Sequence, residues 1–296
     1  MEKFISNYIK ERDRLHARNM TSLRVSIMKY FNLIKAKIIS DLNEKGIDHV
    51  VLNQDNYLLG GIEPYIRPFY SKIGLAFASQ TYKSIADQLK QKKQTPSVEV
   101  GFYSQKWVDE MNNYAQKMSS TRIKNIDEFT RYEIKKILNN PDLYRGGERK
   151  MIPAIRKATG LSKVRSQRIA RTETTNASEY GSYISAKSYS GTIKKKWLAT
   201  HDGRTRDWHA ISSLEEQIVD LDGYFEVDGE KMLHVGDPNA SGKNVVNCRC
   251  TNLYVPVRQE ITVNETFIQK PSINVEQMRS IQSLTTAIVE ILNVNQ

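Results

Sequence analysis

The side chains that bind metals most readily are gathered in one short stretch of this 296-residue chain. Three of its five histidines, His201, His209 and His234, lie there, as do both of its cysteines, Cys248 and Cys250. Imidazole nitrogens and thiolates are the usual ligands of zinc, and a structural zinc takes four of them in a tetrahedral array. Such an ion also supplies folding energy to a unit too small for a full apolar core. A structural zinc site is therefore one interpretation of this stretch.

The spacing of the two cysteines leaves more than one interpretation open. A disulfide across so short a loop would be strained, and Cys-x-Cys is tighter than the usual Cys-x-x-Cys of zinc sites. Either the thiols share a metal, or they pack as small hydrophobic side chains on a buried strand while His209 makes a hydrogen bond in a loop. A nucleophilic role for Cys248 is less favoured, because the interior of a strand does not favour a reactive thiolate.

A charged segment precedes His209 and contains Asp202, Arg204, Thr205 and Arg206. Arginine forks bind phosphates in a bidentate manner, so the segment could form a phosphate-binding or catalytic loop. In the alternative interpretation, Asp202 pairs with the arginines and holds a turn that aligns His209. If the segment around Arg249 is a strand, that side chain points away from the two cysteines and joins the same charged cluster.

Positive charge is concentrated in one quarter of the chain. The net charge is +11, and positions 141–206 contain 15 Lys and Arg against 5 Asp and Glu, so nearly all of the excess lies there. A clustered basic surface favours an anionic partner, either nucleic acid or an acidic protein face. The alternative is a solvated surface without a partner. The side chains expected to face an anionic partner share one predicted helix: Lys163, Arg165, Arg168 and Arg171.

The first 190 residues have the apolar spacing of helices. Long helices are predicted at 4–44, 68–93 and 104–139, with Gly46, Thr95-Pro96 and Asn140-Pro141 at their ends. Two further helices, split near Gly160, follow them. The long helices indicate a bundle or an extended hairpin, and their aromatic residues are expected to pack in its core.

After Gly191 the pattern changes to that of strands. Segment 192–200 alternates, Asp228-Gly229 separates strands at 224–227 and 230–235 in a hairpin, and 245–257 forms the last strand. The predicted fold class is α+β, with a long helical N-terminal region and a small β-rich C-terminal domain. The expected division is 1–145 (helical bundle or hairpin), 146–190 (basic helical neck), 191–257 (β-rich domain) and 258–296 (a tail with an amphipathic stretch at 275–292).

The N-terminus is charged throughout and lacks the apolar stretch of a signal peptide. No run approaches the roughly 18–20 apolar residues that span a bilayer. We therefore expect a protein made and kept in a reducing cytoplasm, without a membrane partner.

Three sequence pieces occur in a specific order. They are ARTETTNAS at 170–178, KKWLATHDGRTRDWH at 195–209 and GDPNASGKNVVNCRC at 236–250. In this order they resemble the C-terminal domain of the Mu-F-like minor head proteins of tailed bacteriophages. The resemblance covers roughly residues 150–255, about a third of the chain, and the helical region before it matches no motif.

The resemblance implies a minor capsid protein of low copy number, found in the virion and, during assembly, in the host cytoplasm. Such proteins are thought to associate with the portal protein and other capsid proteins, and to act in head assembly or DNA delivery. The residues matching the family pattern for a metal, zinc in our interpretation, are His209, Cys248 and Cys250, with the fourth ligand open among His201, Asp202 and His234. The structural motif comprises Trp197, Asp202, Arg204, Thr205, Arg206, Asn247 and Arg249.

Two other functions stay open. A metal, a base such as His209 and phosphate-binding arginines are the parts of a nuclease, and some head proteins of this type are fused to effector enzymes such as ADP-ribosyltransferases. The sequence nevertheless contains no paired-carboxylate cluster, no Gly-rich phosphate loop and no added segment with such a motif. A sequence-nonspecific DNA-binding module would use the basic stretch, but no aromatic platform accompanies it. We therefore expect a structural protein rather than an enzyme.

Overall fold

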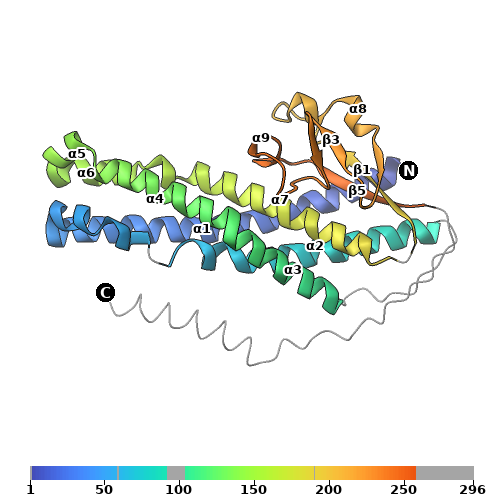
Figure 1. Ribbon diagram of the computed structural model, residues 1–296, viewed down its shortest axis with the longest axis horizontal. Helices are drawn as coiled ribbons and strands as arrows, with labels where there is room; N and C mark the ends of the chain where they lie inside the picture. The colour runs from blue at the N-terminus through green and yellow to red at the C-terminus, as the bar shows by residue number, and fades with distance from the viewer. Residues whose placement is uncertain (1, 59, 92–103, 190, 258–296) are drawn as a thin grey trace.

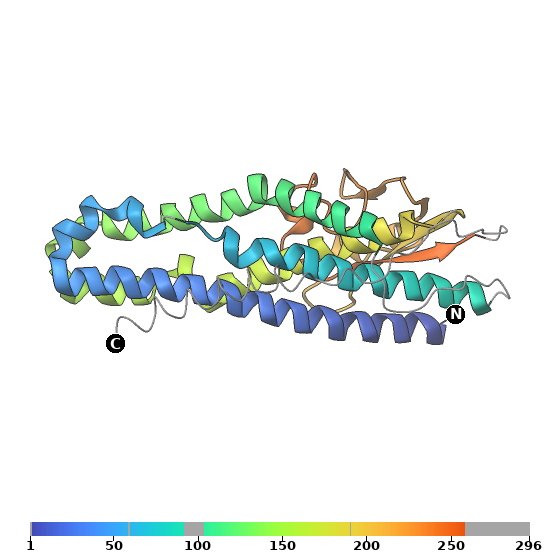
Figure 2. The ribbon, with the colours of Figure 1, turned by 90° about the horizontal axis from the view of Figure 1, so that it is seen from below.

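Three long helices form the body of the molecule in the computed structural model, which describes residues 2–58, 60–91, 104–189 and 191–257. They are α1 (Glu2–Leu52), α2 (Glu63–Gln91) and α7 (Lys163–Lys187), and they run lengthwise beside one another (Figures 1 and 2). A small β-rich unit sits on this bundle at the end where α1 begins (Figure 1). None of the described helices contains a stretch long and apolar enough to cross a membrane.

The length of α1 follows from its apolar spacing. Its buried residues recur every three or four positions, which places them on one face of a helix: Leu23, Ile27, Tyr30, Phe31, Ile34, Ile38 and Leu42. At Gly46 the backbone has φ 81°, a value that glycine adopts at little cost. The predicted end of the helix at Gly46 is therefore a kink, and the helix continues to Leu52.

The predicted helix at 104–139 is one rod in three parts: α3 (Gln105–Met118), η2 (Ser119–Ile123) and α4 (Lys124–Leu138). The Ser104 side chain accepts a hydrogen bond from the backbone N–H of Trp107 and caps the rod. The middle part, η2, is a turn of π-helix, a widened turn that is frequent at functional sites. The remaining short elements of the bundle are η1 (Gln54–Leu58), α5 (Pro141–Arg145), α6 (Gly147–Arg156) and η3 (Thr159–Leu161).

Helix α7 is the most deeply buried element. From 172 to 186 every residue except the half-buried Tyr180 is buried. Two glycines allow α7 to approach α2 closely, since a Cβ atom on Gly181 would lie 2.1 Å from the carbonyl oxygen of Gly74. The segment expected to form a neck, 146–190, thus supplies a helix that packs along α1 and α2.

The β-rich unit contains two small antiparallel sheets. Strand β1 (Ile193–Leu198) lies between β2 (Ile218–Asp220) and β5 (Thr251–Pro256), and β3 (Phe225–Val227) pairs with β4 (Glu230–Met232). The second sheet turns at Asp228-Gly229, as predicted, with positive φ at both residues, as this type of hairpin turn requires. Three short helical elements complete the unit: η4 (Asp207–His209), α8 (Ser212–Glu215) and α9 (Gly242–Val245).

The two parts of the molecule have separate apolar cores. The larger core fills the bundle and extends to Tyr254 of β5. The smaller core belongs to the β-rich unit and has only nine fully buried members: Trp197, Leu214, Phe225, Val227, Met232, Val235, Val245, Cys248 and Cys250. Two of these nine are the cysteines, so two of the candidate metal ligands are also part of the unit's packing.

The structure confirms the α+β fold class, but the last strand is shorter than predicted. Strand β5 begins only at Thr251, because α9 extends to Val245 and Asn247 adopts φ 62°, which interrupts an extended chain. Both cysteines therefore lie in a loop before the strand and not within it. The amphipathic stretch predicted at 275–292 lies outside the described residues.

Candidate metal centre and its connections to the bundle

Three side chains converge inside the β-rich unit. The Nδ1 atom of His209 lies 3.6 Å from the Sγ atom of Cys248 and 3.6 Å from that of Cys250. The three ligand atoms all lie within 4.8 Å of one another, and all three residues are buried. These residues are therefore placed so that they could hold a metal ion together, and one nitrogen with two sulfurs is a donor set that suits zinc.

Asn244 fixes the orientation of the His209 ring. The Trp208 indole donates from Nε1 to Asn244 Oδ1 at 2.8 Å, and Asn244 Nδ2 donates to the carbonyl oxygen of Val227. Because an indole N–H can only donate, Oδ1 must face Trp208. The same oxygen lies 3.4 Å from Nε2 of His209, which therefore carries the ring proton. The lone pair of Nδ1 then points toward the two sulfurs, as a metal ligand requires.

The two thiols are electrostatically linked. A hydrogen bond between them raises the pKa of Cys248 well above its usual range and lowers that of Cys250. The pair can therefore release one proton easily and holds the other. A bound cation would replace that second proton, because metal ligation takes the thiolate form. The donors, their tautomer and their protonation all fit a zinc ion.

The candidates for a fourth ligand lie elsewhere. His201 is exposed and pairs with Glu215 at 3.0 Å. The Nδ1 atom of His234 lies 2.8 Å from the carbonyl oxygen of Val235, and its ring packs against Tyr180 and Tyr183. Asp202 forms ion pairs with Arg204 and Arg249. Among the described histidines, cysteines and carboxylates, only His209, Cys248 and Cys250 therefore lie close enough together to share a metal ion.

The charged segment before His209 forms a turn. Asp202 accepts hydrogen bonds from the backbone N–H of Arg204 at 2.9 Å and from Nη2 of Arg249 at 2.5 Å. The Thr205 hydroxyl donates to the carbonyl oxygen of Thr200. The Thr200 hydroxyl donates to the carbonyl oxygen of Arg249. These bonds join the turn to the loop that carries both cysteines (the cysteine loop, residues 246–250). The connection runs through Arg249, the residue between the two cysteines.

Arg206 and Trp197 support the centre from its two sides. Arg206 does not pair with Asp202 but donates from Nη2 to the carbonyl oxygen of Val246 at 2.6 Å. Trp197 of β1 is completely buried, and its ring meets that of His209 edge-on with 5.3 Å between centroids. Aromatic rings in this arrangement attract one another beyond their burial of apolar surface.

A row of polar side chains on α7 holds the cysteine loop. The hydroxyl of Thr172 accepts from the backbone N–H of Asn247 at 2.9 Å, and Thr175 donates to the carbonyl oxygen of Cys248 at 3.0 Å. Arg171 donates from Nη1 to the Asn247 side chain at 2.6 Å. The loop that carries both cysteines is therefore bonded directly to the bundle.

Glu179, one turn further along α7, joins three parts of the chain. Its carboxylate pairs with Arg12 of α1 at 2.5 Å and accepts from the hydroxyl of Thr251 at 2.7 Å and the backbone N–H of Asn252 at 3.1 Å. The Arg12 and Glu179 side chains are 4% and 2% exposed. A buried carboxylate needs such complete pairing, because an unpaired one would cost several kcal/mol.

Comparison with known families identifies the part of the chain that builds this site. Residues 142–253 match the model of a family described as phage Mu protein F-like protein. This segment matches the Mu-F-like family. The family recognised from the sequence is therefore confirmed over these residues, and all three sequence pieces fall within them.

The structure gives a physical reason for the order of the pieces in the Mu-F-like segment. The first piece, on α7, supplies Thr172 and Thr175; the second supplies the Asp202 turn and His209; the third supplies the cysteine loop. Each piece makes hydrogen bonds to, or shares candidate ligands with, another.

One curated relative also matches part of the chain. Over 106 residues the chain is 38% identical to NAD(+)--arginine ADP-ribosyltransferase EFV of Enterococcus faecalis. The match covers 34% of this chain and 21% of that protein, so the chain spans about a fifth of the relative's length. No solved structure matches the chain.

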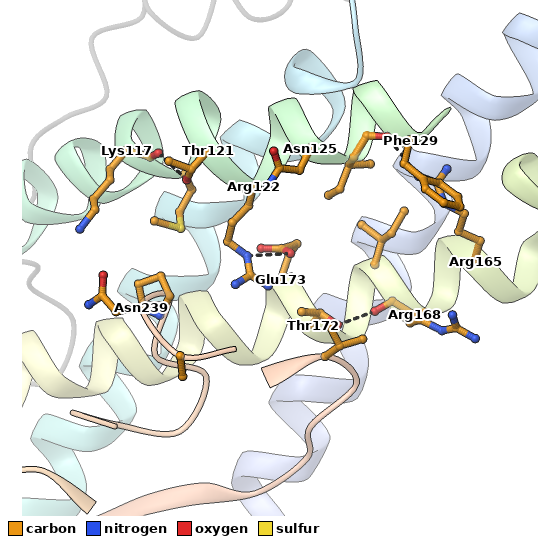
Figure 3. Close-up of a pocket in the computed structure, with 16 residues that line it drawn as sticks. Lys117, Thr121, Arg122, Asn125, Phe129, Arg165, Arg168, Thr172, Glu173 and Asn239 are labelled. Carbon is orange, nitrogen blue, oxygen red and sulfur yellow. Dashed lines mark hydrogen bonds and ion pairs between the residues drawn. The ribbon is translucent and has the colours of Figure 1, made fainter. Parts of the chain in front are cut away.

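The four basic residues that were predicted to share one face of α7 have different surroundings. Lys163 and Arg168 are exposed. Arg165 is half-buried, donates to Thr130 and to the carbonyl oxygens of Gly160 and Ile126, and has its pKa lowered to about 10 by burial. Arg171 lies at the cysteine loop. Of these four, Arg165 and Arg168 line one groove (Figure 3).

Sequence reasoning did not nominate several residues of the site. Asn244, Thr172 and Thr175 stand within the quoted pieces, so their place in those pieces was an available signal. Arg12 and Glu179 form a long-range pair, 167 positions apart, that no local pattern reveals.

Proposed function

We propose that this chain is a minor component of the head of a tailed bacteriophage and acts in head morphogenesis. The observation that carries the proposal is the match of residues 142–253 to the Mu-F-like family, together with the convergence of the three sequence pieces on one site. The chain would then reside in the virion with other capsid proteins, and in the host cytoplasm during assembly.

Within that role, we propose the portal protein as the direct partner. A protein of low copy number in an assembling head needs a unique binding place, and the portal supplies one. The fixed position of the β-rich unit on the bundle supports this proposal, because a pre-organised surface loses less entropy on binding than a mobile one. Contact with packaged DNA is a second proposed interaction and would draw on the net charge of +11.

We further propose that the metal centre is structural and takes zinc. His209, Cys248 and Cys250 would hold the ion, and the ion would cross-link η4 to the cysteine loop. These residues are 1%, 2% and 4% exposed, which favours a structural role over a catalytic one, since a catalytic site keeps a position open to substrate.

The portal proposal is tested by co-expression with the portal protein of the same phage, followed by size-exclusion chromatography at low and high salt. A stable complex at low salt is expected, and its loss at high salt would indicate binding through charged surface. Absence of a complex at every salt concentration would contradict the portal role. Binding of the chain to bulk DNA, with a steep fall as salt rises, would then favour the DNA interaction.

A phosphate-acting enzyme is the alternative proposal, supported by the arginines around the Asp202 turn. An enzyme should keep its fold and lose activity on DNA or RNA when His209 is changed to Ala. A structural site should instead lose the fold of the β-rich unit, observed as a loss of near-UV circular dichroism.

A further inference from the structure

A groove lies between the bundle and the β-rich unit and is separate from the metal centre. It has a volume of about 520 Å³, and its walls come from α3, η2, α4 and α7 on one side and from the loop at 238–240 with Val246 on the other (Figure 3). The groove therefore includes η2, the π-helical turn of the rod. The contacts of the metal centre do not account for this widened turn.

The lining of the groove is strongly basic. It contains Lys117, Arg122, Arg165 and Arg168 against a single carboxylate, Glu173. That carboxylate is already satisfied, since it pairs with Arg122 Nε at 3.2 Å and accepts from the hydroxyl of Tyr70 at 2.8 Å. The remaining positive charge has no counterpart within the groove.

Arg122 is held ready for a ligand. Its Nε atom is engaged by Glu173, and among the described residues its two terminal nitrogens make no hydrogen bond. Its side chain is 19% exposed, and Figure 3 shows its guanidinium extending from the rod toward α7. An arginine fixed in this way loses little entropy when its free N–H groups bind a carboxylate.

Two further cations lie nearby without partners. Lys117 and Arg168 are exposed, and neither makes an ion pair with a described residue. Arg168 also lies close enough to Arg165 to contribute to the lowering of the Arg165 pKa, after the larger effect of burial. A bound anion would relieve this repulsion between like charges.

The rest of the groove is apolar. Met118, Ile126, Phe129, Ile169, Pro238 and Val246 contribute to its lining. Phe129 is 50% exposed, which is unusual for a phenylalanine. A concave apolar wall beside a few cations suits a side chain of a peptide, whereas surfaces that bind the DNA backbone are mainly polar.

We propose that this groove binds an acidic segment of a partner protein. Acidic side chains of the segment contact Arg122 and Arg168, and a neighbouring apolar side chain packs against Phe129 and Ile169. Because both the rod and the 238–240 loop line the groove, the bound segment joins the bundle to the β-rich unit. This proposal goes beyond the head role and does not depend on it.

The test selects binders from a library of short random peptides with the full-length chain as bait. A double variant, Lys117→Glu with Arg168→Glu, removes the exposed cations of the groove without touching the Arg122–Glu173 pair. The matched control, Lys136→Glu with Lys163→Glu, makes the same change of charge at exposed positions of α4 and α7 outside the groove. Circular dichroism establishes that both variants are folded.

The expected peptides carry Asp or Glu beside Leu, Phe or Met. They should bind the groove variant at least about tenfold more weakly than the unaltered chain, and the control variant with unchanged affinity. A short DNA duplex in excess should not displace them. Three outcomes would overturn the proposal: selected peptides without carboxylates, equal binding to the groove variant, or displacement by DNA, which would make nucleic acid the ligand of the groove.

Discussion

The bundle and the β-rich unit are stabilised in different ways. The bundle has a long continuous apolar core, and its helices approach so closely that α2 and α7 meet at two glycines. The β-rich unit has nine core residues, and much of its attachment consists of hydrogen bonds with α7, including two to the Glu179 carboxylate that is paired with Arg12. The bundle should therefore be most sensitive to added volume, and the unit to lost polar partners.

The largest effect is expected at the buried ion pair between α1 and α7, whose carboxylate also accepts hydrogen bonds from β5. Changing Arg12→Met leaves the Glu179 carboxylate buried without its cation, which should cost about 3–5 kcal/mol of unfolding free energy. Chemical denaturation measures this loss. Arg67→Met, which breaks the exposed pair with Glu63, is the control and should cost less than about 1 kcal/mol. Equal effects of the two changes would contradict the account.

A second prediction concerns volume in the bundle. The methyl group of Gly181→Ala would lie 2.1 Å from the carbonyl oxygen of Gly74, so the two helices must separate. Such overpacking should cost about 3 kcal/mol, observed as a lower melting temperature. Gly203→Ala, whose methyl group would meet nothing within 4 Å, should change stability by no more than about 0.5 kcal/mol. A neutral Gly181→Ala would refute the close approach.

A smaller effect is expected at the cysteine loop. Thr175→Val keeps the shape of the side chain but removes the donor to the carbonyl oxygen of Cys248, together with the hydroxyl that lies 3.0 Å from Nε2 of His16. The cost should be about 1–2 kcal/mol, because the carbonyl loses a buried partner. Thr121→Val, at an exposed threonine that bonds only within its own helix, is the matched comparison and should be nearly neutral. The two unfolding curves would coincide if the loop were held by packing alone.

The smallest effect is a dependence on pH. Burial, followed by repulsion from Arg12 and Arg171, lowers the pKa of His16 from 6.5 to about 3. Below about pH 6.5 the unfolded chain takes up a proton that the folded chain refuses. The contribution of His16 is therefore complete above that pH and is lost as pH falls toward 3. Because His16 is partly exposed, screening limits the loss at about pH 5 to about 1 kcal/mol.

The His16 prediction is measured by denaturation at a series of pH values, with His16→Gln as the reference. The variant should show a weaker fall in stability between about pH 6.5 and 5 than the unaltered chain. Parallel curves for the two proteins would mean that His16 titrates normally in the folded chain.

The sequence predicted the helices better than the environments of their side chains. The spacing of residues such as Ile27, Ile34 and Ile38 identified α1, because apolar periodicity is a local property. Lys195 illustrates what it could not predict: a lysine on a strand is expected in solvent, yet it is completely buried and donates to the carbonyl oxygens of Leu221 and Leu233. Its pKa is accordingly lowered to about 8.

The candidate site was predicted in part for the same reason. The residue types and order of His209, Cys248 and Cys250 indicated a shared centre. The polar residues of α7 were expected to include a basic outer face, whereas Thr172, Thr175 and Glu179 are buried because loops from the β-rich unit supply their partners. Those loops are 70 or more positions away, so only the tertiary structure brings them together.

The central claim is that a zinc ion at His209, Cys248 and Cys250 completes the core of the β-rich unit. Zinc content of the purified full-length chain, measured by mass spectrometry together with near-UV circular dichroism before and after chelation, tests it most directly. We predict about one zinc ion per chain, its loss in the Cys248→Ser, Cys250→Ser variant, and loss of the tertiary signal of Trp197 and Trp208 when the ion is removed. A chain that binds no zinc at neutral pH, and whose spectrum is unchanged by chelator, would contradict it.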